Sequence, residues 1–177
     1  MAYLEYNYLL SDEQDLGSVS GSNTNTASTN AVNLQTIRDL AQGHPLFLHF
    51  NVTEAFDGGT DLRLLPVIVG PGDVSGGVAN LLGTSQRVVG STPVMLVADD
   101  LNLNADIVIP IGGLTKGVSA GNQAANSALY GHTLPHGCYF GVVYNSNGTF
   151  TAGKITARLS LQSGGVVPDI YPASTSS

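Results

Sequence analysis

A pentapeptide at 117–121, Gly-Val-Ser-Ala-Gly, has the letters of a nucleophile elbow, the turn that carries the catalytic serine of many hydrolases. That fold places an acid and then a histidine downstream of the serine. Here no Asp or Glu lies between Ser119 and His136, which is the last histidine. In a chain with 22 glycines such a pentapeptide arises easily. We therefore predict no catalytic residues and no enzymatic activity.

The histidines do not form a predicted metal site. His132 and His136 are four residues apart, a spacing that would bring two imidazoles to one side of a helix. Pro135 disfavours that helix, and no third ligand stands nearby. The glycine-rich segment Gly70–Gly77 lacks the register of a phosphate loop, and the aspartates lack the spacing of a calcium loop. We expect neither a metal nor a cofactor.

The composition points to a protein partner. Only 11% of the 177 residues are charged, so Ser, Thr, Asn and Gly must cover much of the surface. Such short side chains lose little rotamer entropy when another protein buries them. The net charge is -7 and the six basic residues are scattered, which argues against nucleic acid. No apolar run reaches the length of about 20 residues that a membrane-spanning helix needs. The N-terminus also lacks the pattern of a secretory signal.

The clearest structural pattern lies between Cys138 and Leu161. An apolar run from Cys138 to Tyr144 is followed by the turn sequence Asn-Ser-Asn-Gly and a second run from Thr149 to Leu161. The second run alternates, with Ile155, Ala157, Leu159 and Leu161 on one face and polar residues on the other. This pattern predicts two β-strands joined as a hairpin. We expect the single cysteine, Cys138, to be a core thiol.

The N-terminal region predicts a strand on a polar arm. Residues Tyr3–Leu10 alternate with apolar side chains on both faces, and Ser11–Asn30 is rich in Ser, Thr, Asn and Gly. We expect a loop or arm over residues 11–30 that lets the first strand dock away from the body. The remaining strand candidates are Leu46–Val52, Leu62–Val69, Arg87–Val89, Val94–Val97 and Asp106–Ile111, and one helical turn is expected at Gln123–Tyr130.

Short strands with frequent Gly, Pro and Asn between them indicate an all-β fold, a β-sandwich or jelly roll. We predict an extended N-terminal strand or arm over residues 1–30, a jelly-roll domain over 31–165 and a C-terminal tail over 166–177. Pro66 predicts that the strand Leu62–Val69 lies at an edge or carries a bulge.

Several blocks, in their common order, resemble the Bbp16-like capsid cement proteins of tailed bacteriophages. They are Ser28–Leu34, Gly43–Leu46 leading into a strand, and Thr149–Ala157. The first strand followed by Ser11–Gln14 fits the same pattern, and between Gly70 and Gln123 the match is by strand order alone. The resemblance implies a jelly-roll protein without catalysis that decorates the outside of a virion. Its implied partners are a major capsid protein of the HK97-type fold and further copies of itself, as a dimer or trimer.

The resemblance implies a clamp that joins capsomers and works in part by strand addition. We therefore expect the first strand to pair with a partner edge, and the polar face of the last strand to touch the capsid. The sequence leaves open a carbohydrate-binding or receptor-binding jelly-roll module and a small serine esterase acting through Ser119. The expected partner-binding residues are Tyr3, Leu4, Tyr6, Tyr8, Leu10, Lys154 and Arg158.

Overall fold

The computed structural model describes residues 7–33, 46–88, 91–111, 118–119 and 138–160. Within these ranges the chain forms antiparallel β-strands and one short 3-10 turn, η1 (Pro71–Asp73), which confirms the predicted all-β class. The strands are β1 (Asn7–Asp15), β2 (Thr24–Ala27), β3 (Val32–Asn33), β4 (Leu46–Gly58), β5 (Asp61–Val69), β6 (Val74–Ser75), β7 (Val78–Ala79), β8 (Arg87–Val88), β9 (Met95–Leu96), β10 (Asp106–Ile111), β11 (Val118–Ser119), β12 (Tyr139–Asn147) and β13 (Phe150–Ser160).

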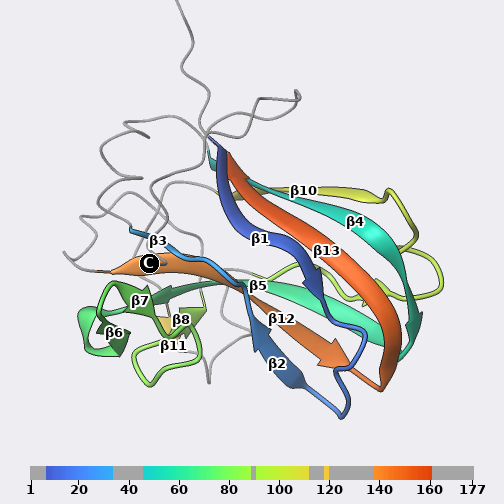
Figure 1. Ribbon diagram of the computed structural model, residues 1–177, viewed down its shortest axis with the longest axis horizontal. Helices are drawn as coiled ribbons and strands as arrows, with labels where there is room; N and C mark the ends of the chain where they lie inside the picture. The colour runs from blue at the N-terminus through green and yellow to red at the C-terminus, as the bar shows by residue number, and fades with distance from the viewer. Residues whose placement is uncertain (1–6, 34–45, 89–90, 112–117, 120–137, 161–177) are drawn as a thin grey trace, which may run out of the picture.

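Two main sheets pack against each other as a β-sandwich (Figure 1). Sheet A has the strand order β1-β13-β4-β10. Sheet B has the order β11-β8-β5-β12-β2, with β3 also paired to β12 and β9 to β5. The small hairpin β6-β7 forms a separate two-stranded sheet. The predicted helical turn at 123–130 and the C-terminal tail lie outside the described residues.

The core between the sheets follows from alternation along the strands. On β13 the side chains of Ile155, Ala157 and Leu159 are buried, as the period-two pattern predicts. On β4 the inward side chains include Phe50 and Val52, while their neighbours in the chain are only half-buried. Burying each large apolar side chain in this way stabilises the folded state by about 1.5–3 kcal/mol relative to leaving it exposed to water.

The segment Cys138–Leu161 is not a hairpin, which corrects the sequence prediction. β12 pairs with β5 in sheet B, whereas β13 pairs with β4 in sheet A. The strands β4-β5 and β12-β13 therefore form one long antiparallel ribbon that bends sharply and passes from one sheet to the other (Figure 1).

Glycines make this bend possible. Gly58, Gly59 and Gly148 have φ values of 68°, 61° and 94°, a region that other residues rarely adopt. Across the bend, Gly59 N donates to Thr149 O at 2.6 Å and Thr60 N donates to Asn147 O at 2.8 Å. The Asn-Gly pair thus serves a crossing between sheets, although the same pair closes hairpins elsewhere.

The described N-terminal residues belong to the sandwich, so the predicted polar arm over residues 11–30 is wrong. β1 extends to Asp15 and pairs with β13, and β2 pairs with β12. Between them, Leu16 N donates to Gly153 O and Phe150 N donates to Val19 O, both at 2.9 Å. Polar composition misled the prediction because backbone hydrogen bonds to two strands, together with buried Leu16, hold this segment in place.

The central strands of sheet B, β5 and β12, are buried on both faces along most of their length. Leu65, Val67 and Val143 point away from the main core and form a second apolar cluster, which the segment 70–88 covers through Leu81. Leu81 lies so close to β12 that a Cβ at Gly141 would collide with its Cδ1. β5 is apolar on both faces for this reason.

Pro66 occupies the position on β5 that its chemistry permits. Leu64 N points away from β12 and donates to Thr92 Oγ1 at 3.0 Å. The nitrogen two residues later faces the same side. β5 pairs with β9 only at residues 61–62 and with β8 only at 67–68, so Pro66 lies in the gap between them. The strand is interior, yet its proline has the local setting of an edge.

Candidate interaction surface

Two of the predicted contact residues of the N-terminal strand, Tyr8 and Leu10, are buried inside the protein. Tyr8 and Leu10 are 5% and 0% exposed and belong to the main core. Tyr3, Leu4 and Tyr6 lie outside the described residues. A bulge between Leu9 and Ser11 turns both Leu10 and Ser11 inward, which a simple alternating pattern does not predict.

A buried chain of hydrogen bonds ties β1 to sheet B. Tyr144 Oη donates to Ser11 Oγ at 2.9 Å, and Ser11 Oγ donates to Gln14 Oε1 at 2.6 Å. Gln14 Nε2 in turn donates to Ala27 O at 2.7 Å. Burial raises the pKa of Tyr144 far above its ordinary value, although the bond to Ser11 opposes this shift. Releasing β1 to a partner would break this network, so strand exchange through residues 7–15 is not supported.

Sheet A presents part of its other face outward, since Thr156 and Ser160 on that face of β13 are buried. Leu9, Arg158, His49 and Val108 stand opposite one another on β1, β13, β4 and β10, and we call these four residues the outer row. Val108 is 48% exposed and the other three are half-buried. The rings of His49 and Phe47 lie 6.5 Å apart by their centroids. The outer row therefore combines two apolar side chains, at its two ends, with an imidazole and a guanidinium between them.

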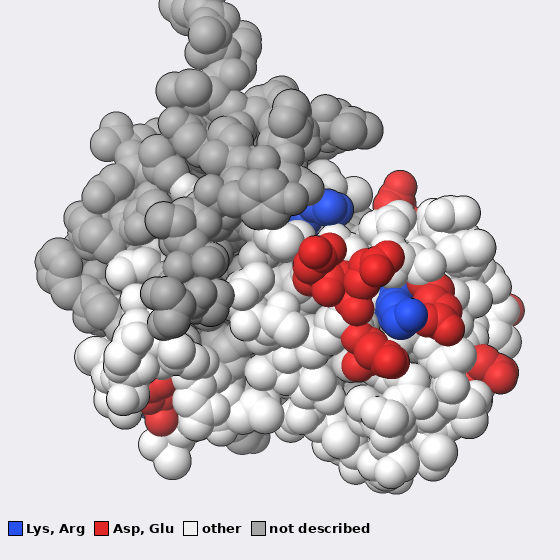
Figure 2. Space-filling model, in the orientation of Figure 1, with Lys and Arg blue, Asp and Glu red and all other residues white. Residues whose placement is uncertain are grey.

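Lys154 lies in a second line across the same face, opposite Asp15 on β1 and Glu54 on β4; we call these three the charged row. Lys154 Nζ is 2.9 Å from Glu54 Oε2. The hydrogen bond and the charge of Glu54, with smaller contributions from Asp15 and Glu13, raise the pKa of Lys154. Figure 2 shows acidic side chains gathered around a basic one on this face. Lys154 is thus neutralised by its neighbours and gives no free positive charge.

β10 closes one end of sheet A in the part of the chain that is described. Asn104, with a φ of 66°, and Ala105 form a bulge against Val52, since Asn104 N donates to Val52 O and Val52 N donates to Ala105 O. Along an antiparallel strand, the backbone groups of successive residues point alternately toward and away from the neighbouring strand. Beyond the bulge, those of Asp106, Val108 and Pro110 therefore point away from β4. Proline has no N–H to offer there, which is how edge strands are commonly protected.

Val108 and the β10 edge were missed by the sequence prediction, which treated Asp106–Ile111 only as a strand. The signal was present, because a proline within an apolar run indicates an edge strand. The outer row itself had no local signal, since its four members come from strands that are distant in sequence.

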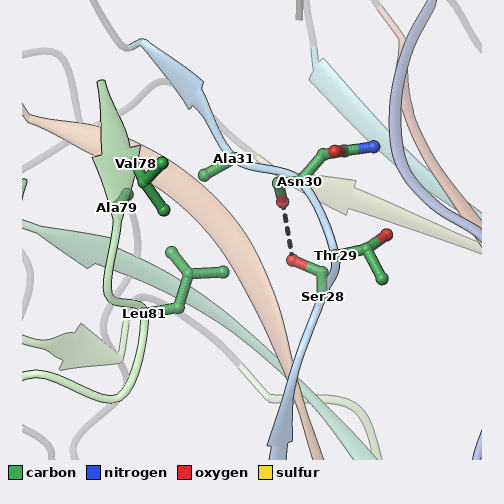
Figure 3. Close-up of a pocket in the computed structure, with 7 residues that line it drawn as sticks. All are labelled: Ser28, Thr29, Asn30, Ala31, Val78, Ala79 and Leu81. Atoms are coloured by element: carbon green, nitrogen blue, oxygen red, sulfur yellow. Dashed lines mark hydrogen bonds between the residues drawn. The ribbon is translucent and has the colours of Figure 1, made fainter. Parts of the chain in front are cut away.

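The described residues also form a small pocket away from the outer row. A pocket of about 40 Å³ lies between the 28–31 segment and β7 (Figure 3). Ser28 Oγ donates to Asn30 O at 2.9 Å beside it, so its main polar group is already satisfied. A volume of this size admits about one water molecule. Its lining residues are Ser28, Thr29, Asn30, Ala31, Val78, Ala79 and Leu81.

Other motifs have simple structural settings. Ser119 is the last residue of β11 and pairs with Arg87 of β8, and the residues that follow it lie outside the described ranges. His132 and His136 fall outside the described residues. Among the residues that are described, no three His, Cys, Asp or Glu side chains gather closely enough to hold a metal ion. Over the same ranges, no helix has the length and apolarity needed to cross a membrane.

Comparison with protein-family models, with curated proteins and with solved structures finds no match for this chain.

Proposed function

We propose that this chain is a structural cement protein that binds the outer surface of an HK97-fold phage capsid and stabilises the expanded shell. The observation that carries the proposal is the asymmetry of the sandwich. The centre of sheet B is covered on both faces, whereas the outer face of sheet A leaves the outer row partly exposed beside the β10 edge. The sequence blocks that resemble Bbp16-like cement proteins support the same function, and it requires no catalysis and no cofactor.

The jelly-roll topology is part of this proposal. The ribbon β4-β5 with β12-β13 supports it, since a jelly roll wraps antiparallel strand pairs across two sheets. In the proposed setting the protein is on the outside of the virion, as a dimer or trimer bound to the major capsid protein.

The proposed mechanism is selective binding. A protein that binds only when capsomers have the mature spacing shifts the shell toward that state by mass action. Many copies act on one particle, so modest affinity at each contact suffices. The rigid attachment of residues 7–33 to the sandwich suits a clamp of fixed geometry.

Within this proposal Leu9 and Val108 of the outer row supply apolar contact and the charged row faces basic groups of the capsid. Three carboxylates, of Glu13, Asp15 and Glu54, surround Lys154, so the surface there is net negative. Electrostatic attraction of this kind extends about 8 Å at physiological salt and guides encounter more than it holds the complex. We expect decoration to become slower in 1 M NaCl, where the Debye length is about 3 Å, while the bound amount at equilibrium falls little; complete release by salt would contradict an apolar grip.

A pair of matched variants tests the outer row. Val108→Glu places a carboxylate on the outer row, and Val78→Glu places one on the β6-β7 hairpin at a similarly exposed site. Both variants should fold, because 48% and 59% of these side chains are already exposed. Mixed with purified expanded heads that lack the protein and then sedimented, Val108→Glu should decorate at least about tenfold more weakly, a loss of about 1.4 kcal/mol. Val78→Glu should match the wild type.

Equal occupancy of wild type and both variants would remove the outer row from the interface. If none of the three proteins bound heads at all, while the wild type was retained on a glycan array, the carbohydrate-binding alternative would replace the capsid proposal. Deletion of residues 1–6 tests the remaining predicted strand residues without removing Tyr8 or Leu10 from the core.

A further inference from the structure

The bend between β12 and β13 holds a chemically labile sequence, Asn147-Gly148, which is the single Asn-Gly pair of the chain. In such a pair the glycine nitrogen attacks the asparagine side-chain carbonyl carbon, forming a new C–N bond while ammonia leaves. Water then opens the resulting succinimide to aspartate or isoaspartate. Glycine favours the reaction because it has no side chain to hinder the approach of its nitrogen.

In the folded chain, however, the attacking nitrogen is occupied. Gly148 N donates to Gly21 O at 3.0 Å, so its proton and its direction are fixed. Asn147 O accepts from Thr60 N at 2.8 Å, which prevents the peptide between Asn147 and Gly148 from rotating. A Cβ at Gly148 would come within 2.8 Å of Gly59 Cα, so the two turns of the bend are in close contact.

The side chain of Asn147 is held as well. Its Nδ2 donates to Asp61 Oδ2 at 3.3 Å, on the neighbouring strand β5. The carbonyl carbon cannot reach Gly148 N unless this bond and the backbone bonds open together. Opening of this kind is a local unfolding step, and reaction then follows the small population of the open form.

We propose that Asn147 is a latent deamidation site that the ribbon bend protects, and that its modification prevents the bend from closing again. Conversion to aspartate sets a second carboxylate beside that of Asp61, where an amide donor stood before. Conversion to isoaspartate adds a backbone atom between Asn147 and Gly148, which breaks the spacing of the hydrogen bonds to Thr60 and Gly21. The fraction of modified Asn147 would then increase with the number of times that the bend has opened.

The first experiment compares deamidation rates. The full chain is incubated at mildly alkaline pH, either folded or in urea, and peptide-mapping mass spectrometry follows Asn147. We expect the folded chain to react at least about tenfold more slowly, equivalent to about 1.4 kcal/mol of opening free energy. Equal rates in the two states would overturn the proposed protection.

The second experiment tests the consequence. Asn147→Asp mimics the aspartate product, and Asn145→Asp is the matched control because Asn145 Nδ2 donates to Asn25 Oδ1 and not to a carboxylate. In urea unfolding, Asn147→Asp should lower the midpoint clearly more than Asn145→Asp. Coincident midpoints for the two variants would show that a carboxylate at 147 does not prevent closure.

Discussion

Replacement of Tyr144 by Phe tests whether the hydrogen-bond network fixes β1 in the sandwich. The Tyr144 side chain is fully buried, and its hydroxyl reaches across the core to Ser11 on β1. Phenylalanine fills nearly the same space, so the change removes the hydroxyl and little packing. Ser11 still donates to Gln14 after the change. We therefore expect a loss of about 0.5–1.5 kcal/mol in the free energy of unfolding.

The complementary change, Ser11→Ala, should cost more. It removes the acceptor of Tyr144 Oη and the donor to Gln14 Oε1 in one step, which leaves two buried polar groups without these partners. A buried group left in this state costs about 1–3 kcal/mol. The double variant should lose less free energy of unfolding than the two single variants lose in sum. The reason is that Ser11→Ala leaves the Tyr144 hydroxyl without its partner, and Tyr144→Phe removes that hydroxyl.

Urea unfolding of the four proteins measures this coupling, with Thr26→Ala on the half-buried surface of β2 as a control. For a chain of this length each 1 kcal/mol should also move the melting temperature by about 2–4 °C. The reasoning fails if the two single changes add within about 0.5 kcal/mol, as independent sites do, or if Ser11→Ala is the milder of the two.

Two further changes should behave as follows. Gly141→Val should cost about 1–3 kcal/mol by overpacking, because a Cβ there would collide with Leu81 Cδ1; adding Leu81→Ala should recover part of the loss in urea midpoints, and no recovery would refute the contact. Alkaline pH should destabilise the wild type more than Tyr144→Phe. The pKa of Tyr144 is raised above its ordinary 10.0 in the folded state, so stability is unaffected by this group below that pH and falls as pH rises above it. The slope from one such proton is at most about 1.4 kcal/mol per pH unit, and identical pH profiles of the two proteins would contradict the buried hydroxyl.

Several strands could be located from the sequence because alternation reports which side chains leave water. Asp106–Ile111 was predicted with the bounds that β10 has, and the inward residues of β13 were predicted correctly. Ser11–Asn30 could not be predicted from composition, since its order depends on bonds such as Asn30 N to Leu10 O at 2.8 Å. Such bonds join backbone groups, which every residue type carries, so the sequence holds little trace of them.

The candidate contact surface was partly predicted and partly not. Lys154 and Arg158 lie on the outward face of β13, as alternation predicts, but Thr156 and Ser160 of the same predicted polar face are buried. The charge environment of Lys154 was not predictable, because Glu54 and Asp15 reach Lys154 only through the pairing of β13 with β4 and β1. Tyr8 and Leu10 looked suited to a partner but fill this chain's own core.

The all-β class, the positions of the longer strands and the buried side of most of them follow from local sequence pattern. These properties depend on neighbours within a few residues, and a period of two records them directly. The pairing of the strands, in contrast, is settled only in the folded chain. Asn147-Gly148 can close a hairpin or carry the chain from sheet B to sheet A, and the choice depends on Gly59, Thr60 and Gly21, which contact it from distant parts of the sequence.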